Sequence, residues 1–249
     1  HYAGYPCRDI LAISQLCREK GIGLIEDVAH APGAIVDGKV CGTFGDVGCF
    51  SFFSNKNLSI GEGGMVSTLD PQLDKKLSYL RSHGMTTLTL DRHKGRAITY
   101  DVAQPGLNYR MDEMRAAIGS VQLDKLPAGN VRRGELTNRY RSNLQGSPVT
   151  MPFENQASNL TSVYHILPIL LPEKTDRVAV IGALKEKRIQ SSIHYPPFWD
   201  FTAYKGQFSP NDSPVTADIC GRQLTLPLFP TMTEAEVDQV CNALLEALA

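Results

Sequence analysis

A lysine and a carboxylate each follow a short apolar stretch of this sequence, and together they could perform chemistry. Asp27 ends the run "GLIED", and Lys56 comes shortly after the aromatic run "CFSFF". In open α/β sheets, ligands bind beyond the carboxyl ends of the strands, so both side chains would lie at such an edge if these runs are strands. A lysine amine can bond covalently to an aldehyde, and a carboxylate can hold a heterocyclic nitrogen protonated. From the spacing alone, an ordinary ion pair, or no contact at all, would be the commoner arrangement.

This pair of residue types suits pyridoxal phosphate particularly well. That cofactor needs a lysine to hold its aldehyde and an acid beside its pyridine nitrogen, because the protonated ring serves as an electron sink. The lysine, once released by substrate, can move a proton as general acid and base. Glu62, Gly63 and Gly64 follow Lys56 in the sequence. We interpret them as a turn that supplies shape rather than chemistry.

The elements that must position this pair alternate between helix and strand. Apolar residues at helical spacing before Gly21 predict a helix that leads into the strand ending at Asp27. Asp70 is expected to cap a later helix. The predicted strands are residues 23–27, 46–53 and 63–68, and the predicted helices lie within residues 6–22 and 71–83. Short apolar strands between amphipathic helices are typical of an α/β domain with a mainly parallel sheet.

The second half of the chain has a different character, which predicts two domains, residues 1–126 and 127–249. A helix is expected to begin at Asp112 and to end near residue 126. Thr233 and Glu236 form a capping box that starts a well-marked final helix. The remaining predicted elements are strands at residues 162–171 and 189–195 and a helix at residues 175–188. This pattern favours a smaller α+β domain.

Composition excludes several classes of protein. The net charge is -1 without long runs of either sign, which argues against a nucleic-acid-binding protein. No apolar run is long enough to cross a bilayer, and no secretory signal is visible. The six cysteines are scattered without a C-x-x-C pair. That pattern is typical of reduced thiols in a cytoplasmic protein and predicts no metal site.

Several blocks of the sequence resemble, in order, the DegT/DnrJ/EryC1/StrS family of pyridoxal-phosphate aminotransferases, which act on nucleotide-linked keto sugars. They are "HYAGYPCRD", "LIEDVAHAPGA", "GDVGCFSFFSNKNLSIGEGGMVST", "LRSHG", "PGLNYRMDEMRAAIGSVQLDKL" and "LPLFPTMTEAEVD". The resemblance implies the fold type I, or aspartate-aminotransferase-like, architecture. Residues 1–126 would then be the C-terminal part of the large cofactor-binding domain, and residues 127–249 the small domain.

The resemblance also implies roles for individual residues. Lys56 would bind the cofactor covalently, and Asp27 would pair with its pyridine nitrogen. His30 would lie near the phenolic oxygen, and Ser51 would donate to the phosphate. Asn108 would contact the phosphate of the cofactor that is bound in the neighbouring subunit of a homodimer. The alternative is that Asn108 is an ordinary turn residue. His165 and His194 would lie on the substrate side of the small domain, or else be ordinary hydrogen-bonded strand residues.

The implied reaction moves an amino group, with glutamate as the expected donor, to a nucleotide-linked keto sugar. A family dehydratase is disfavoured because Lys56 is present where such enzymes have histidine. The alternative is a regulatory or inactive relative that binds the cofactor without turnover. Arg92, Lys94 and Arg96, in a long loop over residues 86–108, could meet nucleotide phosphates, although a solvated loop is the favoured interpretation.

The sequence departs from the family in one respect. Members carry a further N-terminal portion with a phosphate-binding turn and an aromatic residue that stacks on the cofactor. Neither is recognisable here, and the chain starts at "HYAG" rather than at a methionine. We therefore expect this chain to be the later part of a longer protein.

Overall fold

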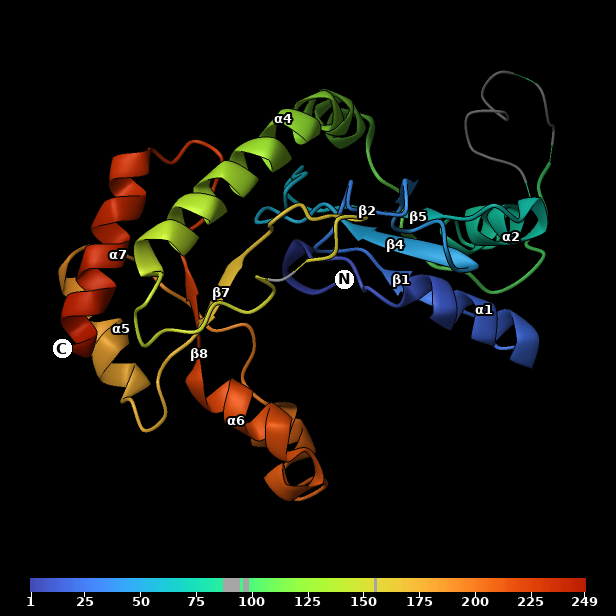
Figure 1. Ribbon diagram of the computed structural model, residues 1–249. Helices are drawn as coiled ribbons and strands as arrows, with labels where there is room; N and C mark the ends of the chain where they lie inside the picture. The colour runs from blue at the N-terminus through green and yellow to red at the C-terminus, as the bar shows by residue number, and fades with distance from the viewer. Residues whose placement is uncertain (87–94, 96–98, 155) are drawn as a thin grey trace. The chain divides into compact units, whose positions relative to one another are not determined.

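The computed structural model describes residues 1–86, 95, 99–154 and 156–249, and these form two compact units (Figure 1). The first unit consists of His1 and Pro6–Leu126, and the second of Tyr2–Tyr5 and Pro127–Ala249. The sequence did not predict that Tyr2–Tyr5 belongs to the second unit. The assignment of residues 1–126 to a large cofactor-binding domain and of residues 127–249 to a small domain stays a prediction. No helix within the described ranges is both long and apolar enough to cross a membrane.

A three-stranded sheet organises the first unit, with β4 (Val47–Ser51) between β1 (Ile25–Asp27) and β5 (Gly64–Ser67). Strand β1 runs parallel to β4, whereas β5 runs antiparallel to it. This mixed sheet differs from the mainly parallel one predicted. Residues 52–63 form only turns and bends between β4 and β5. Without a crossover helix, the chain returns in the opposite direction. The described part of this unit also contains a small antiparallel hairpin of β2 (Ile35–Val36) and β3 (Lys39–Val40).

Two helices, α1 (Ile10–Lys20) and α2 (Pro71–Leu80), flank these strands in the sequence. Helix α1 ends as predicted at Gly21, which has a φ of 64°. Glycine adopts that left-handed conformation without the steric cost that a Cβ atom adds. The Asp70 side chain accepts hydrogen bonds from two amides of the first turn of α2, which confirms the predicted cap. The helix ends at Leu80, earlier than expected.

Helix α4 (Glu113–Leu144) is much longer than predicted. It begins beside Asp112, whose carboxylate accepts a hydrogen bond from the Arg115 amide at 2.9 Å. It then continues past Pro127, where the sequence predicted its end. A proline inside a helix removes one backbone hydrogen bond but does not have to stop the helix when packing compensates. Leu136, Tyr140 and Leu144, which follow Pro127, are buried in the core of the second unit, and their burial explains the extension.

The second unit packs three helices and a strand pair around one apolar core (Figure 1). Strands β7 (Leu167–Leu170) and β8 (Gln223–Leu226) pair antiparallel. The predicted strand at residues 189–195 is reduced to one isolated bridge, Ser192 to Thr225. The capping box of α7 is confirmed, because Thr233 and Glu236 bond each other's backbone amides. The other elements of this unit are β6 (Leu160–Thr161), α5 (Arg177–Glu186), α6 (Pro214–Arg222), α7 (Glu234–Leu248) and the short 3-10 turns Phe198–Asp200, Thr202–Tyr204 and Pro210–Asp212.

The turn Tyr2–Gly4 completes the second unit from the other end of the chain. The amides of Val163 and His165 donate to the carbonyl oxygens of Gly4 and Ala3, at 2.8 and 2.9 Å. Gly4 has a φ of +89°, and a Cβ atom there would lie 2.5 Å from the His165 nitrogen. Only glycine fits such a close approach between two backbones.

Arg133, a buried residue of helix α4, binds two other segments of the second unit. It is 7 % exposed, and its Nη1 donates to the carbonyl oxygens of Tyr164, His165 and Leu228 at 3.4, 3.1 and 2.8 Å. Burial lowers the pKa of this guanidinium to about 10. The side chain therefore satisfies carbonyl groups that would otherwise be buried without a donor.

We expect Arg133→Met to destabilise the protein by roughly 3 kcal/mol, because buried carbonyl groups without donors cost about 1–3 kcal/mol each. Arg115→Met is the matched control. Arg115 is exposed on the same helix, and its one ion pair among the described residues is with Asp112, so its loss should cost under about 1 kcal/mol. Urea unfolding of both variants checks the prediction. Equal destabilisation of the two would show that Arg133 has no such role.

Candidate active site

Lys56 lies in the turn that follows β4, and its environment favours the neutral amine. Its backbone amide donates to the Phe53 carbonyl at 3.0 Å, and its side chain is half-buried. Burial lowers the pKa of Lys56, whereas the nearby charge of Asp27 raises it, and the effect of burial is the larger. A lysine with a lowered pKa is a better nucleophile near neutral pH, since only the unprotonated amine attacks a carbonyl.

The loop around Lys56 is held by packing and by backbone contacts. Leu58 and Ile60 are buried and form an apolar cluster with Leu126. The Ile60 amide donates to the Phe52 carbonyl at 3.0 Å, and the Phe52 amide donates to the Gly63 carbonyl at 2.9 Å. The glycines after Lys56 are needed for shape, as expected. A Cβ atom on Gly64, for example, would lie 2.7 Å from the Phe50 carbonyl oxygen.

Asp27 lies at the same end of the sheet as the lysine loop. It is the last residue of β1 and pairs in register with Cys49 of β4. Its side chain is exposed, and Oδ1 accepts a hydrogen bond from the Ala29 amide at 2.9 Å. The structure thus brings Asp27 and Lys56 together closely enough for the charge of one to act on the pKa of the other.

His30 and Ser51 lie next to these two residues in the chain. Ser51 ends β4, and its Oγ accepts a hydrogen bond from the Phe53 amide at 3.4 Å. His30 is half-buried in the turn after β1, where the Ala31 amide donates to the Val28 carbonyl at 2.9 Å. Both positions are compatible with the roles that the resemblance implies, and those roles stay predictions.

Asn108 lies in an exposed segment of the first unit that pairs with Ser82 through an isolated antiparallel bridge. Its Oδ1 accepts a hydrogen bond from the Arg110 Nε at 3.0 Å. A guanidinium can only donate, so this contact fixes the orientation of the carboxamide and directs its NH₂ group elsewhere. This orientation is compatible with the role that the resemblance implies for Asn108, and that role stays a prediction. Arg92, Lys94 and Arg96 lie outside the residues that the structure describes.

The two candidate substrate histidines belong to the second unit and differ in exposure. His165 is 4 % exposed. Its backbone amide donates to the Ala3 carbonyl, and its carbonyl oxygen accepts a hydrogen bond from Arg133 Nη1. His194 is half-buried, and its Nδ1 lies 2.9 Å from the Thr225 Oγ1. Of the two, His194 has the accessibility that substrate contact requires. Both assignments stay predictions.

Sequence reasoning missed Glu26, which is 2 % exposed in the middle of β1. Its carboxylate accepts hydrogen bonds from the amides of Gly42, Phe44 and Gly45. It also contacts the His1 Nε2 at 3.1 Å. The alternation of a strand gives the signal that could have found it, because Glu26 and Asp27 must face opposite sides of the sheet. Glu26 shapes the loop before β4 and leaves Asp27 as the accessible acid.

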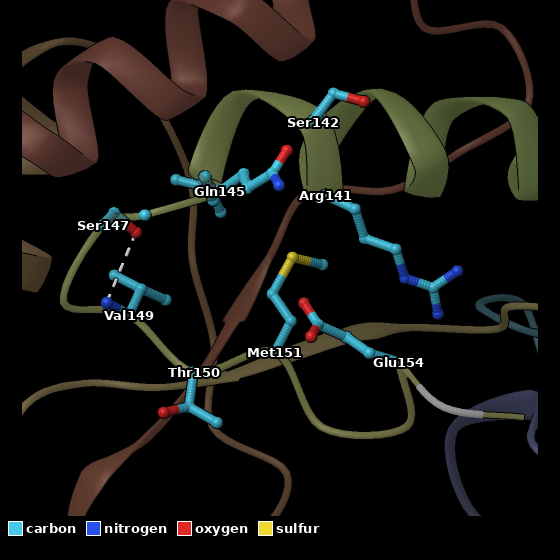
Figure 2. A pocket seen from close by; sticks show the side chains of 10 residues that line it. Arg141, Ser142, Gln145, Ser147, Val149, Thr150, Met151 and Glu154 are labelled. Carbon is cyan, nitrogen blue, oxygen red and sulfur yellow. Dashed lines mark hydrogen bonds between the residues drawn. The ribbon is translucent and has the colours of Figure 1, made fainter.

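A pocket in the second unit contains none of the predicted site residues (Figure 2). Arg141, the cation at this pocket, already donates from Nη1 to the Asn138 Oδ1 at 3.1 Å and from Nη2 to the Phe153 carbonyl at 3.3 Å. Figure 2 shows its side chain extending away from Ser147. We assign this pocket no part in the chemistry. Its lining residues are Arg141, Ser142, Leu144, Gln145, Gly146, Ser147, Val149, Thr150, Met151 and Glu154.

The residues present fit pyridoxal phosphate. Burial lowers the pKa of Lys56, which increases the fraction of neutral amine that can attack an aldehyde. Asp27 has an accessible carboxylate at the same edge of the sheet. These two groups are also the pair that the sequence singled out.

Comparisons with known proteins identify the family of the chain. Residues 1–245 match the DegT/DnrJ/EryC1/StrS aminotransferase family. The chain is 36 % identical over 252 residues to the dTDP-4-dehydro-2,3,6-trideoxy-D-glucose 4-aminotransferase of Saccharopolyspora spinosa, covering 100 % of this chain and 64 % of that protein.

Solved structures give the same result. The aminotransferase TlmJ from Streptoalloteichus hindustanus matches with a TM-score of 0.88 and 32 % identity, over 100 % of this chain and 64 % of that one. The sugar aminotransferase Spr1654 of Streptococcus pneumoniae, described as putative, was solved in a PLP form. It matches with a TM-score of 0.88 and 26 % identity, over 99 % of this chain and 66 % of that one.

This chain therefore spans about 64 % of the length of the curated relatives that it matches. The likeness to solved sugar aminotransferases covers both units of the structure and confirms an α/β chain of their fold. Together with the family match over residues 1–245, it shows that the chain belongs to the DegT/DnrJ/EryC1/StrS aminotransferase family.

Proposed function

We propose that the protein containing this chain is a pyridoxal-phosphate-dependent aminotransferase that moves an amino group from glutamate to a nucleotide-linked keto sugar. The observation that carries this proposal is that Lys56 and Asp27 lie at one edge of the β1–β4 pair, close enough for the charge of Asp27 to act on the pKa of Lys56. Family membership supports the reaction class. The name of the relative from Saccharopolyspora spinosa supports a dTDP-linked keto sugar as the acceptor.

Lys56 and Asp27 have complementary roles in this proposal. When bound, pyridoxal phosphate supplies the electron sink that lets an amino group leave one carbon and join another. Asp27 holds a proton on the ring nitrogen through a charge-assisted hydrogen bond. Lys56 binds the cofactor covalently between cycles, and its amine moves the proton at the substrate carbon.

The other residues orient the two molecules. The Ser51 hydroxyl donates a hydrogen bond to the phosphate, and His30 contacts the cofactor ring beside Asp27. The NH₂ group of Asn108 donates a hydrogen bond to the phosphate of the cofactor bound in the partner subunit. Arg110 orients the Asn108 carboxamide for this contact. His194 contacts the sugar.

An amino-transfer assay tests this function. The complete gene product, loaded with pyridoxal phosphate, should release one 2-oxoglutarate per Lys56 when given L-glutamate alone. It should turn over continuously once a dTDP-linked 4-keto sugar is added. D-glutamate is the control donor. Cofactor binding without release of 2-oxoglutarate, or of the corresponding oxo acid from any other L-amino acid, would favour the non-catalytic relative instead.

Mixing of subunits tests the proposed homodimer. Lys56→Ala and Asn108→Ala parents should each be nearly inactive, because every site would lack one of the two residues. In a heterodimer, Lys56 of one subunit meets Asn108 of the other, so one site is complete. An equimolar mixture should therefore regain about a quarter of the wild-type activity, since half of the dimers are mixed and each has one of two sites intact.

The mixing experiment needs evidence that subunits exchange. Two affinity tags, one on each parent, show this by copurification. If tagged heterodimers form and the activity does not rise, Asn108 acts within its own subunit or not at all.

A further inference from the structure

His194 has both backbone polar groups held in place within the second unit. Its amide donates to the Gln223 Oε1 at 2.8 Å. Its carbonyl oxygen accepts a hydrogen bond from the Tyr2 hydroxyl. Gln223 is 3 % exposed and is the first residue of β8. These two hydrogen bonds, from residues far away in the sequence, hold the backbone of His194 and therefore restrict the position of its imidazole.

The direction of each hydrogen bond around His194 follows from the chemistry of the groups. A backbone amide can only donate, so the Gln223 atom that it meets is the carbonyl oxygen. The Gln223 Nε2 is then the atom that donates to the Thr225 Oγ1, at 2.7 Å. This contact leaves the Thr225 hydroxyl with one proton to donate.

The Thr225 hydroxyl proton has one suitable acceptor among its described contacts. Thr225 is 4 % exposed, and a buried hydroxyl donates wherever an acceptor is in reach. The His194 Nδ1 lies 2.9 Å from Oγ1. Ser192 Oγ, 3.5 Å from the same nitrogen, is too distant to compete. Nδ1 accepts this hydrogen bond, so the proton of the neutral imidazole is on Nε2.

We propose that Gln223 and Thr225 are positioning residues that fix His194 in the Nε2–H tautomer, so that it donates a hydrogen bond to an oxygen of the sugar substrate. The ring of contacts is closed, because the His194 amide binds Gln223, Gln223 binds Thr225, and Thr225 binds the His194 imidazole. A donor of this kind selects a hydroxyl or carbonyl oxygen. The proposal rests on the aminotransferase function for the identity of the ligand, but not for the tautomer.

The tautomer can be measured directly by 15N NMR of histidine-labelled protein. In the wild type, the His194 signals should show a protonated Nε2 and an unprotonated Nδ1. Thr225→Val, which removes the hydroxyl at nearly constant volume, should give a mixture of both tautomers. Thr225→Ser keeps a hydroxyl and should restore the wild-type signals. Thr137→Val is the matched control, since Thr137 is also buried in this unit and its hydroxyl donates to the Arg133 carbonyl, away from His194.

Binding of dTDP-glucose, a stable nucleotide sugar, tests the role of the donor. Thr225→Val should weaken binding of dTDP-glucose in proportion to the share of the Nε2–H tautomer that the 15N signals show to be lost, about twofold for an equal mixture, because only that tautomer donates to the sugar. Thr225→Ser and Thr137→Val should bind like the wild type. Circular dichroism and the remaining NMR signals show whether each variant is folded.

Two outcomes would overturn the proposal. One is a wild-type His194 protonated on Nδ1, or a tautomer that does not change in a folded Thr225→Val variant. The other is a changed tautomer with unchanged dTDP-glucose affinity, which would remove His194 as a donor to the sugar. If the wild type itself did not bind dTDP-glucose, the nucleotide-sugar function would fail, whereas the 15N signals would still decide whether the positioning residues act as stated.

Discussion

Replacing Lys56 with alanine is expected to abolish covalent attachment of pyridoxal phosphate and to lower amino transfer by roughly a thousandfold or more. The variant loses both the covalent bond and the amine that moves the proton, and proton transfer by a positioned side chain alone contributes about 10²–10⁴-fold. Borohydride reduction followed by peptide mapping should find the cofactor label on Lys56 of the wild type and on no peptide of the variant.

Two further measurements make this prediction specific. Lys76→Ala, at an exposed position of α2, should leave labelling and turnover unchanged. A small primary amine added to Lys56→Ala should restore part of the proton transfer, and with it part of the turnover. A variant that still carries a borohydride-fixed label would place the covalent site on another lysine.

Replacing Asp27 with asparagine should slow turnover by at least about tenfold while pyridoxal phosphate still binds. Asparagine keeps the size of the side chain but removes the negative charge that holds the ring nitrogen protonated. The loss of one charge-assisted hydrogen bond amounts to about 1.5–3 kcal/mol, or roughly 10- to 100-fold. Steady-state rates with L-glutamate check the effect, and Asp74→Asn on α2 is the control.

The same substitution has a second consequence, which concerns Lys56. Asp27 raises the pKa of Lys56 and so opposes the lowering caused by burial. Without that charge the pKa of Lys56 should fall further, and the amine should become reactive at lower pH. The pH at which Lys56 reacts half-maximally with free pyridoxal phosphate should therefore be lower in Asp27→Asn than in the wild type. An unchanged pH profile together with unchanged turnover would place the ring acid elsewhere.

Local signals explain what the sequence predicted well. The cap of α2 by Asp70 and the capping box of α7 depend on residues within one helical turn, and such contacts are visible in the sequence itself. The placement of Asp27 and Lys56 at one sheet edge followed from a general property of α/β sheets. That inference needed only the ends of two strands.

Long-range contacts explain what the sequence could not predict. Helix α4 continues past Pro127 because the residues after it are buried against distant strands and helices. The sequence alone showed only a helix-breaking residue at that point. Sequence analysis did not single out Glu26, because its burial depends on amides of residues 42–45, which a loop brings back to β1. The hydrogen bonds that orient His194 come from β8 and from Tyr2, far away in the chain.

The docking of Tyr2–Gly4 against residues 163–165 has a consequence for protein engineering. The second unit consists of two separate segments of the chain, Tyr2–Tyr5 and Pro127–Ala249. A chimera that exchanges only residues 127–249 between relatives would leave its Gly4 counterpart in the host sequence, where any larger side chain would collide with the incoming backbone. During synthesis, moreover, the Tyr2–Gly4 turn emerges long before its partner, so this contact closes only after some 160 further residues have been made, a separation that slows folding. Recombination within the family should therefore succeed best when residues 2–5 and 127–249 are transferred from the same parent, or when the host also has glycine at position 4.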